Sequence, residues 1–245
     1  MIKKYKDGKF VEYSSLLEAL GIEEKNPILS VVGAGGKTTT IAALAGEYRK
    51  RHVPVLVTTT THMKIEEAPW FVLEPSMEKV RKVLDLEGMA WVGIPDKDGK
   101  MKAPSGQFLE HLIQWGVPVL IEADGSKRLP LKAPAAYEPV LLKETTHVLS
   151  LYGLDAVGKT IEEVCFRPTA AAGLLGKSLT EKVSPGDILD LALDAKGGKK
   201  GILPTMKYIL ILNKADTRER EHFAAKICGR AAMQGISDIL VTAYE

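Results

Sequence analysis

The fold expected for this chain is decided by one stretch, Ile28-Leu29-Ser30-Val31-Val32-Gly33-Ala34-Gly35-Gly36-Lys37-Thr38-Thr39-Thr40. It opens with a mostly apolar run of strand length, its glycines allow the backbone to turn with positive φ, and a helix-compatible segment begins at Thr38. At such a junction of strand, turn and helix, backbone NH groups converge on one point where the helix dipole favours an anion. The stretch therefore predicts a phosphate-binding loop.

Lys37 and Thr38 give this loop the chemistry that a nucleoside triphosphate needs. The Lys37 ammonium would stabilise negative charge on a transferred phosphoryl group, so Lys37 is a candidate catalytic residue. The Thr38 hydroxyl would bind a magnesium ion that bridges the phosphates. The predicted cofactors are thus Mg²⁺ and GTP or ATP. The residues expected to hold the phosphates are Gly33, Ala34, Gly35, Gly36, Lys37, Thr38 and Thr39.

The spacing of the loop departs from the common phosphate-loop pattern, in which a glycine stands six residues before the lysine. Val31 occupies that position here, and Gly33 stands four residues before Lys37. This short form resembles the glycine, two residues, glycine, lysine, threonine pattern of the Mur ligases. The alternative interpretation is a glycine-rich strand-to-helix turn with an exposed lysine.

Length and composition predict one α/β domain over residues 1–245, because 45% hydrophobic residues suffice for a sizeable core. Within it, residues 1–27 are expected to be an N-terminal lead-in and residues 66–104 to contain a β excursion. In the lead-in, Ser15-Leu16-Leu17-Glu18 matches a capping box and predicts a short helix that ends at Gly21. The formal net charge of +2 gives no reason to expect nucleic acid as a partner. Cys165 and Cys228 lack CxxC spacing, so neither a disulfide framework nor a zinc site is indicated. Since no apolar run approaches the roughly 20 residues that span a bilayer, no membrane partner is expected and the protein is predicted to be cytoplasmic.

A second buried strand, Val53-Pro54-Val55-Leu56-Val57, follows the first helix, and this order implies a right-handed parallel crossover. The run Thr58-Thr59-Thr60-Thr61-His62 comes next, at the sheet edge where the glycines lie. Its hydroxyls would hold metal-bound water or phosphate oxygens. The alternative is an ordinary threonine run in a strand, since threonine favours β structure.

Two carboxylates follow the next buried strand, Val117-Pro118-Val119-Leu120-Ile121. Glu122 and Asp124 are spaced by one residue at the end of that strand, from which they can approach the cation as a Walker B acid does. We therefore assign the metal to Thr38, Glu122 and Asp124. Asp124 is also the second candidate catalytic residue, because Asp124 and His62 are the candidates for activating an attacking water. The alternative is a surface turn with solvated charges.

Basic residues follow these acids in the sequence. Lys127, Arg128 and Lys132 are candidates for contacts with a phosphate or an anionic substrate. Arg167 precedes an alanine-rich helix whose first turn holds Pro168, and it is another candidate for a phosphate contact. A salt bridge at the helix end is the more ordinary role for Arg167.

A late apolar strand, Tyr208-Ile209-Leu210-Ile211-Leu212, ends in Asn213-Lys214-Ala215-Asp216, which matches the NKxD element of GTPases. In that element the asparagine fixes loops near the nucleotide, the lysine stem lies over the base, and the aspartate accepts hydrogen bonds from guanine. Asn213, Lys214 and Asp216 are therefore predicted to bind the base. Adenine lacks the matching donor pair, so a buried carboxylate left unpaired would reject it. The alternative is that Asp216 caps a helix beginning at Thr217.

The motifs above occur in an order that resembles one known group, the YqeC-type proteins, which are predicted accessory factors of selenium-dependent molybdenum hydroxylases. The resemblance rests on VVGAGGKTTT, VLVTTTTH, VLIEADGSKRLPLKAP, LSLYGLDAVGK, RPTAAAGLL and LILNKAD, and it runs over nearly the whole chain. It implies a P-loop NTPase-like protein tied to the maturation of a molybdenum or selenium centre in a partner hydroxylase. It supplies no reaction of its own.

These observations predict a three-layer α/β fold of the P-loop NTPase type with a mainly parallel sheet. The expected function is Mg²⁺-dependent binding and hydrolysis of GTP or ATP, coupled to assembly or delivery of a molybdenum or selenium cofactor. One alternative is an ATP-dependent ligase or small-molecule kinase that uses a carboxylate like Glu122. Another is a non-enzymatic switch that binds nucleotide to change its grip on a partner hydroxylase.

Overall fold

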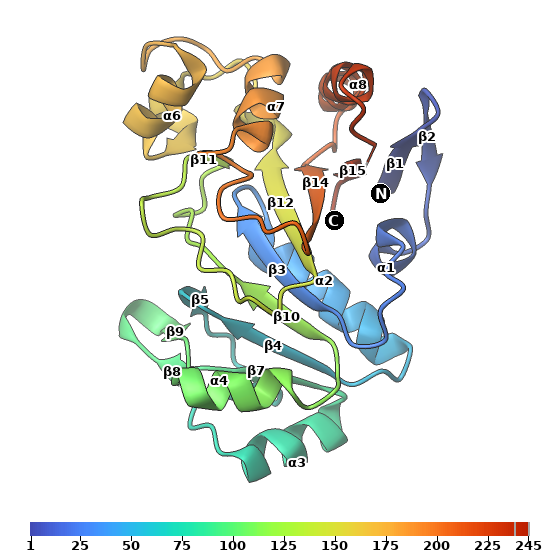
Figure 1. The fold of residues 1–245 in the computed structure, drawn as a ribbon, viewed down its shortest axis with the longest axis vertical. Helices are drawn as coiled ribbons and strands as arrows, with labels where there is room; N and C mark the ends of the chain where they lie inside the picture. Colours follow the sequence, from blue (N-terminus) through green and yellow to red (C-terminus); the bar gives the residue numbers. More distant parts are fainter. Residues whose placement is uncertain (238, 245) are drawn as a thin grey trace.

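The protein is built around a sheet of ten strands, which a computed structural model describes for residues 1–237 and 239–244 (Figure 1). In spatial order the strands are β2 (Lys9–Glu12), β1 (Ile2–Lys6), β15 (Ile239–Thr242), β14 (Lys207–Asn213), β12 (His147–Gly153), β3 (Ile28–Gly33), β10 (Val119–Glu122), β4 (Val55–Thr59), β7 (Met89–Val92) and β6 (Phe71–Val72).

The sheet is mixed but mostly parallel, which confirms the predicted α/β class. All strands from β15 to β6 run parallel to their neighbours, whereas β1 pairs antiparallel with both β15 and β2. The central strands β3, β10 and β12 are buried along their whole length. Their sequences are nearly continuous apolar runs because a parallel sheet is covered on both faces.

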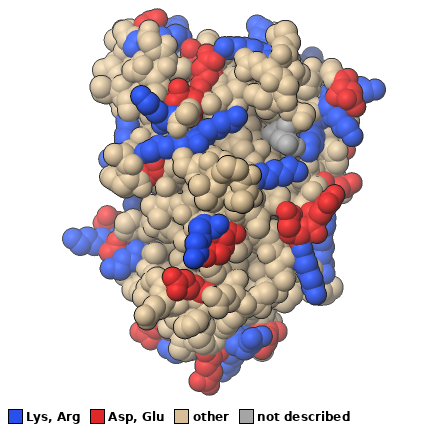
Figure 2. Space-filling view, in the orientation of Figure 1, with Lys and Arg blue, Asp and Glu red and all other residues tan. Residues whose placement is uncertain are grey.

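Helices pack on both faces of the sheet. Leu29 and Val31 of β3 lie in a core cluster with α1 (Leu16–Leu20) and α2 (Lys37–Lys50), whereas Ile28 and Val32 face the opposite side. That opposite face is covered by α3 (Met77–Glu87), α4 (Gly106–Ile113), α7 (Pro185–Leu193) and α8 (Arg218–Met233). None of the helices in residues 1–237 and 239–244 is long and apolar enough to cross a membrane. Basic and acidic side chains are interspersed over the face in Figure 2, as the small net charge implies.

The N-terminal residues 1–27 form more regular structure than a polar lead-in. Ser15 accepts a hydrogen bond from the Glu18 NH group and Gly21 ends α1 in the left-handed conformation, so this helix begins and ends as predicted. Glu47 of α2 accepts the NH groups of Leu16 and Leu17 at 2.7 and 2.9 Å, which fixes α1 against α2. β1 was not predicted because three of its five residues are lysines and give no apolar strand pattern. It pairs with β2, which follows it, and with β15 from the other end of the chain.

Residues 62–104 contribute to two different sheets. β6 and β7 extend the main sheet in parallel, and a separate antiparallel sheet is formed by β5 (His62–Lys64), β9 (Lys100–Lys102) and β8 (Ile94–Pro95). The short helix η1 (Lys97–Gly99) connects β8 to β9. Within the predicted excursion at residues 66–104, the antiparallel strands are therefore confined to residues 94–102. The third strand of their sheet, β5, precedes the excursion.

The topology brings four functional segments to one edge of the sheet. β14, β12, β3 and β10 are consecutive neighbours, so their carboxyl ends at Asn213, Gly153, Gly33 and Glu122 lie side by side. A second small sheet, β11 (Leu131–Lys132) with β13 (Cys165–Phe166), adds to this edge together with η2 (Leu154–Ala156), α5 (Ile161–Val164) and α6 (Pro168–Leu175). The carboxyl edge of a parallel sheet is where ligands of α/β proteins bind.

Candidate functional site

Residues 33–39, which we call the glycine loop, connect β3 to α2 in close contact with the neighbouring strands. Gly33, Gly35 and Gly36 have φ values of 88°, 80° and 131°, which disfavour residues with a side chain. A Cβ on Gly33 would lie 2.3 Å from the Leu151 carbonyl oxygen, and one on Gly36 would lie 2.2 Å from Asn213 Nδ2. Conformation and packing therefore both require glycine at these positions.

The backbone NH groups of the glycine loop fall into two sets. The first set donates within the protein: Gly33 to Asp124 Oδ2 (2.9 Å), Ala34 to the Leu151 carbonyl (2.8 Å) and Gly35 to the Leu129 carbonyl (3.1 Å). The Gly35 NH group, which was expected to face the phosphates, therefore donates to the protein itself in this structure. The NH groups of residues 36–39 have no acceptor in the described part of the chain, since the first backbone bond at the start of α2 runs from Thr40 to Gly36.

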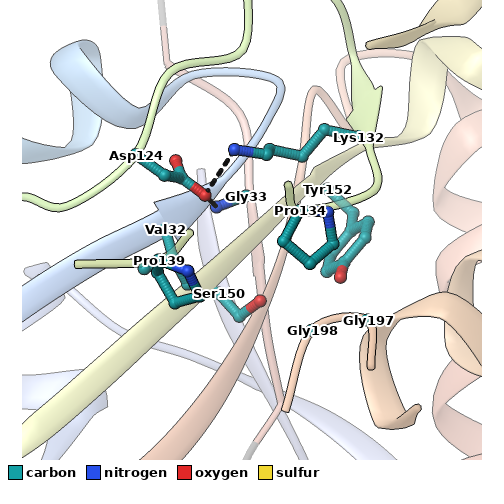
Figure 3. A pocket seen from close by; sticks show the side chains of 10 residues that line it. All are labelled: Val32, Gly33, Asp124, Lys132, Pro134, Pro139, Ser150, Tyr152, Gly197 and Gly198. Carbon is teal, nitrogen blue, oxygen red and sulfur yellow. Dashed lines mark hydrogen bonds and ion pairs between the residues drawn. The ribbon is translucent and has the colours of Figure 1, made fainter. Parts of the chain in front are cut away.

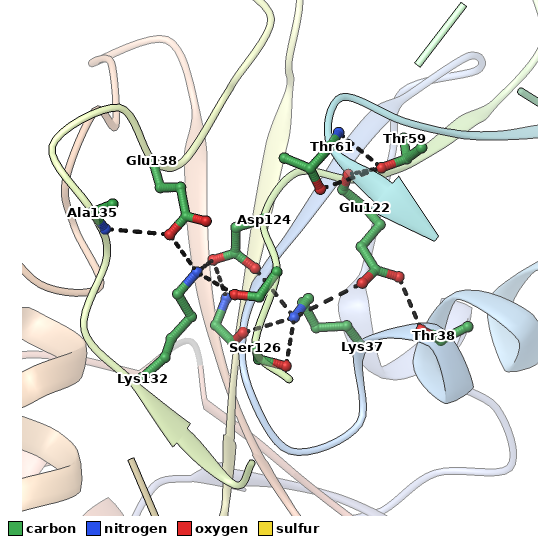
Figure 4. A network of polar contacts seen from close by, with 12 residues as sticks. Lys37, Thr38, Thr59, Thr61, Glu122, Asp124, Ser126, Lys132, Ala135 and Glu138 are labelled. Carbon is green, nitrogen blue, oxygen red and sulfur yellow. Dashed lines mark hydrogen bonds and ion pairs between the residues drawn. The ribbon is translucent and has the colours of Figure 1, made fainter. Parts of the chain in front are cut away.

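Lys37 is buried, with only 3% of its side chain exposed, so the alternative of an exposed lysine is wrong. Its ammonium donates to the Gly33 carbonyl at 2.9 Å and to Ser126 Oγ at 3.1 Å. It also lies 3.2 Å from Asp124 Oδ1 and 3.9 Å from Glu122 Oε1 (Figure 4). Lys37 thus bends back over its own loop toward the two predicted acids.

Glu122 and Thr38 meet directly, as their assignment to one metal site requires. Thr38 Oγ1 donates to Glu122 Oε2 at 2.9 Å. Burial raises the pKa of Glu122, and the opposing effects of the Lys37 charge and the Thr38 hydrogen bond are too small to reverse this shift. The folded protein therefore holds a proton on this carboxyl more tightly than an exposed glutamate would.

Asp124 is buried between the glycine loop and a second lysine. Its Oδ2 accepts the Gly33 NH group and lies 2.9 Å from Lys132 Nζ. Its Oδ1 is buried and accepts no hydrogen bond from the residues that the structure describes, although the Lys37 ammonium lies 3.2 Å away. Since a buried carboxylate oxygen normally has a donor, Asp124 Oδ1 is a candidate contact for a ligand.

Lys132 has a structural role that differs from the predicted contact with substrate. Its side chain is 2% exposed, and its ammonium has three acceptors: Asp124, the Gly125 carbonyl (2.7 Å) and Glu138 Oε2 (2.8 Å). Glu138 also accepts a hydrogen bond from Arg167 at 2.7 Å. Burial alone would raise the pKa of Glu138, but the bonds from Lys132, the Ala135 NH group and Arg167 outweigh it and lower this pKa.

A small cavity lies beside this network on the face of the sheet away from α2 (Figure 3). It measures about 10 Å³, enough for roughly one water-sized molecule, and its lining includes Asp124, Lys132, Ser150 and Tyr152. Ser150 Oγ is buried and has no hydrogen-bond partner among the described residues. The cavity therefore places polar groups of Ser150 and Tyr152 near Asp124, and the glycine loop borders it at Gly33.

The threonine run is internal structure rather than ligand contact. Thr58, Thr59 and Thr60 each donate a hydroxyl to a backbone carbonyl at 2.8 Å, belonging to Val92, Glu122 and Val140 respectively. Thr58 and Thr59 belong to β4, as the alternative of an ordinary strand run predicts, whereas Thr60 and Thr61 follow the strand. Thr59 also helps to fix Glu122. His62 is exposed and pairs with Asp96 at 2.8 Å in the three-stranded sheet, so its ring is directed elsewhere.

Asn213 joins the glycine loop to the last strands. Its Nδ2 donates to the Gly35 carbonyl at 2.8 Å, and its Oδ1 accepts the Thr242 hydroxyl at 2.9 Å. Lys214 Nζ lies 2.7 Å from Asp155 Oδ2, and Asp155 Oδ1 is buried without a hydrogen-bond partner in the described chain. The asparagine of the NKxD element thus contacts the glycine loop directly, whereas the lysine pairs with Asp155.

Asp216 is exposed and pairs with Arg220 on the first turn of α8. The N-cap of this helix is Thr217, whose hydroxyl accepts the Arg220 NH group. The alternative in which Asp216 itself caps the helix is therefore wrong. Its carboxylate is accessible from solvent.

Several residues of the site were absent from the sequence interpretation. They are Ser126, Leu129, Glu138, Asp155 and Thr242. Each acts through a contact outside its own segment. Ser126, Leu129 and Asp155 stand in stretches that carry the family resemblance, but those stretches do not show which residue each one contacts. The only available signal was their position next to predicted site segments, as for Ser126 after Asp124.

Comparison with known proteins gives two consistent matches. The family model described as "YqeC protein" matches residues 29–169, which include the glycine loop, both acids and Arg167. A curated relative, the "Uncharacterized protein YqeC" of Escherichia coli (strain K12), is 29% identical over 210 residues, covering 83% of this chain and 82% of the relative.

We predict that Lys132→Met destabilises the protein by about 3–5 kcal/mol, because it leaves Asp124 and Glu138 buried without their shared cation. The free energy of unfolding is measured by urea denaturation. Lys182→Met removes an exposed lysine and serves as the control, with an expected change below about 0.5 kcal/mol. Adding Glu138→Gln to Lys132→Met should cost less than the sum of the two single changes; strict additivity would contradict the proposed coupling.

Proposed function

Because this chain belongs to the YqeC protein family and carries a lysine-bearing glycine loop beside two buried acids, we propose that it is a P-loop NTPase-like protein. It binds a nucleoside triphosphate with Mg²⁺ and hydrolyses it. The single observation that carries this proposal is the set of unpaired NH groups of residues 36–39 next to the buried Lys37 ammonium. Phosphate oxygens are the acceptors that such an arrangement suits.

The residues present fit a magnesium ion. The Thr38 hydroxyl and the Glu122 carboxylate are oxygen donors in direct contact, and Asp124 Oδ1 is a buried carboxylate oxygen without a hydrogen bond in the described residues. Mg²⁺ prefers such oxygens and usually takes one or two carboxylates, with water and phosphate oxygens completing its shell. No group of three or more His, Cys, Asp or Glu residues that could hold a metal ion is found in residues 1–237 and 239–244.

Each residue then has a defined part in hydrolysis. Lys37 moves from the acids to the β- and γ-phosphates and stabilises the charge that develops on the transferred group. A magnesium ion held by the Thr38 hydroxyl and Glu122 would neutralise charge on the phosphate oxygens. With the ion on these two residues, Asp124 Oδ1 would orient the attacking water and accept its proton, while Oδ2 stays bound to the Gly33 NH group and Lys132. His62 is engaged with Asp96, so Asp124 is the remaining candidate for this step.

The base-binding part of the proposal rests on Asn213, Lys214 and Asp216. Asn213 donates a hydrogen bond to the Gly35 carbonyl, so the NKxD segment and the glycine loop are held in a fixed relative position. Asp216 is exposed and can exchange its bond with Arg220 for hydrogen bonds from guanine. This chemistry favours GTP over ATP, because adenine cannot supply the two donors.

The cellular role that we propose is maturation or delivery of the molybdenum or selenium cofactor of a partner hydroxylase. This part rests on the resemblance to YqeC-type proteins alone. Nucleotide hydrolysis would supply the driving force or the timing of that transfer.

A ligase or kinase is the second candidate, and one specific observation favours it. Basic side chains outnumber acidic ones around the site, which suits a second anionic substrate in addition to the nucleotide. Such an enzyme would show little turnover until its acceptor is added, whereas a nucleotide switch would show negligible turnover even with its partner hydroxylase.

Replacing the loop lysine gives the first functional prediction. Lys37→Ala should weaken binding of a fluorescent GTP or ATP analogue by about 100-fold or more, because it removes the charge-assisted contacts to the phosphates. Lys50→Ala, at the exposed far end of α2, is the matched control and should bind as the parent does. Undiminished affinity in the Lys37 variant would remove the central assignment.

A second prediction separates the two nucleotides. Asp216→Ala should reduce affinity for GTP by roughly 10- to 100-fold, as expected for lost hydrogen bonds to a charged acceptor, and leave ATP affinity unchanged. Arg220→Ala frees Asp216 from its ion pair and should retain the preference for GTP. Equal affinities for GTP and ATP, unaltered by Asp216→Ala, would reject base recognition by this residue.

A third prediction uses the raised pKa of Glu122. Because the folded protein holds this proton more tightly than the unfolded chain, Glu122 stabilises the fold at low pH and loses that contribution as pH rises through its folded pKa. Glu122→Gln should therefore gain in melting temperature relative to the parent between pH 5 and pH 8, while losing Mg²⁺-dependent nucleotide binding. Glu78→Gln, exposed on α3, is the control; a melting difference independent of pH would contradict this account.

A further inference from the structure

Basic residues near the glycine loop adopt an unusual backbone conformation. Lys127, Arg128 and Arg167 have φ values of 47°, 62° and 64°, in the left-handed region that long side chains seldom occupy. Backbone strain of this kind persists only where the surrounding structure imposes it, and it collects at functional sites. The three residues therefore call for an explanation beyond ordinary turn formation.

The turn that carries Lys127 and Arg128 is fixed to the glycine loop. The Leu129 NH group donates to the Ser126 carbonyl at 3.0 Å, which closes the turn. The Leu129 carbonyl accepts the Gly35 NH group, and Ser126 Oγ accepts the Lys37 ammonium. Lys127 and Arg128 are thus held as exposed residues at the tip of a turn that contacts the glycine loop at both ends.

The ring of Phe166 gathers the basic side chains into one cluster. The Arg167 guanidinium lies 4.2 Å from the ring centroid, Lys127 Nζ lies 5.3 Å from it and Lys132 Nζ lies 5.9 Å from it. Cations are attracted to an aromatic face, but like charges at these separations repel one another. The cluster therefore favours an anion.

The carboxylates nearby do not balance these charges. The cations of the region are Lys37, Lys127, Arg128, Lys132 and Arg167, and the carboxylates are Glu122, Asp124 and Glu138. Glu138 is shared by Lys132 and Arg167. Among the described residues, no carboxylate forms an ion pair with Lys127 or Arg128.

We propose that Lys127, Arg128 and Arg167 form a second oxyanion subsite, beside the glycine loop, that binds the phosphate group of a co-substrate. This inference rests on the proposed nucleotide site and gives the second substrate a chemical class, a phosphorylated small molecule. Guanidinium groups suit it because their planar donors pair with phosphate oxygens two at a time. Lys132 is excluded from this role, since its ammonium already has three acceptors. Arg167 binds Glu138 and the Ala133 carbonyl through Nη1, so its Nη2 and Nε donors are the ones assigned to the anion.

The test uses calorimetry with inorganic phosphate as the probe. Phosphate is titrated into the full chain saturated with Mg²⁺ and a non-hydrolysable GTP or ATP analogue, which occupies the nucleotide site. We expect one further site, weakened at least tenfold in Lys127→Ala/Arg128→Ala, with affinity for the analogue within twofold of the parent. Lys79→Ala/Lys82→Ala removes two exposed charges from α3 and should leave phosphate binding unchanged.

The outcomes distinguish this inference from the nucleotide proposal. If the analogue binds but phosphate does not, or if the double variant binds phosphate as tightly as the parent, the subsite is refuted. If the double variant loses affinity for the analogue itself, the basic residues belong to the nucleotide's own γ-phosphate and the co-substrate assignment is wrong. If no nucleotide binds at all, phosphate is titrated into Lys37→Ala without nucleotide, with and without the Lys127→Ala/Arg128→Ala changes. Binding that is lost with these two changes supports the subsite, and binding that is absent or unaffected by them refutes it.

Discussion

Asp124 is a fully buried carboxylate shared by two buried lysines and one backbone NH group, and the rest of the site is arranged around it. A charge removed from water is tolerated only when opposite charges and hydrogen-bond donors replace its hydration. The same requirement for an opposite charge applies to the next residues. The buried Lys132 ammonium is paired with Glu138, and the Glu138 carboxylate is paired with Arg167. The result is a chain of alternating charges that fixes the ends of β3 and β10, the start of α2, the β11 strand and the start of α6 relative to one another.

The parallel sheet explains why this chain of charges is placed at one edge. Strands β14, β12, β3 and β10 end side by side, so a residue just past each end reaches its neighbours without long connections. Asn213 is the clearest example, since its amide bonds to Gly35 on one side and Thr242 on the other. The close approach of these strand ends also explains the glycines of the loop, because a side chain at Gly33 or Gly36 would collide with the adjacent strand ends. Packing of the sheet and conformation of the loop are thus one constraint.

The parts predicted correctly from sequence are those with a local signal. The apolar runs predicted the strands of the parallel sheet, and the N-cap Ser15 together with Gly21 predicted the two ends of α1. The pairing of Thr38 with Glu122 followed from two motifs at neighbouring strand ends. By contrast, the roles of Thr59, Lys132 and Glu138 depend on which distant backbone or side chain each meets, and no local pattern encodes that. The threonine run shows the difference, because its composition suits either a ligand site or a strand, and only the neighbouring carbonyls decide.

The nucleotide binding that we propose would be an exchange of partners. In the structure the Lys37 ammonium contacts the Gly33 carbonyl, Ser126 and the two acids, so a phosphate must offer more than these contacts do. If Lys37 turned to a phosphate, Glu122 and Asp124 would lose part of their compensating charge, and the proposed divalent cation would restore it. Because burial raises the pKa of Glu122, that cation would also have to displace a proton whenever the carboxyl is protonated. The proposal therefore couples the lysine, the acids, the metal and the nucleotide energetically, since a phosphate without its cation would meet acids that repel it.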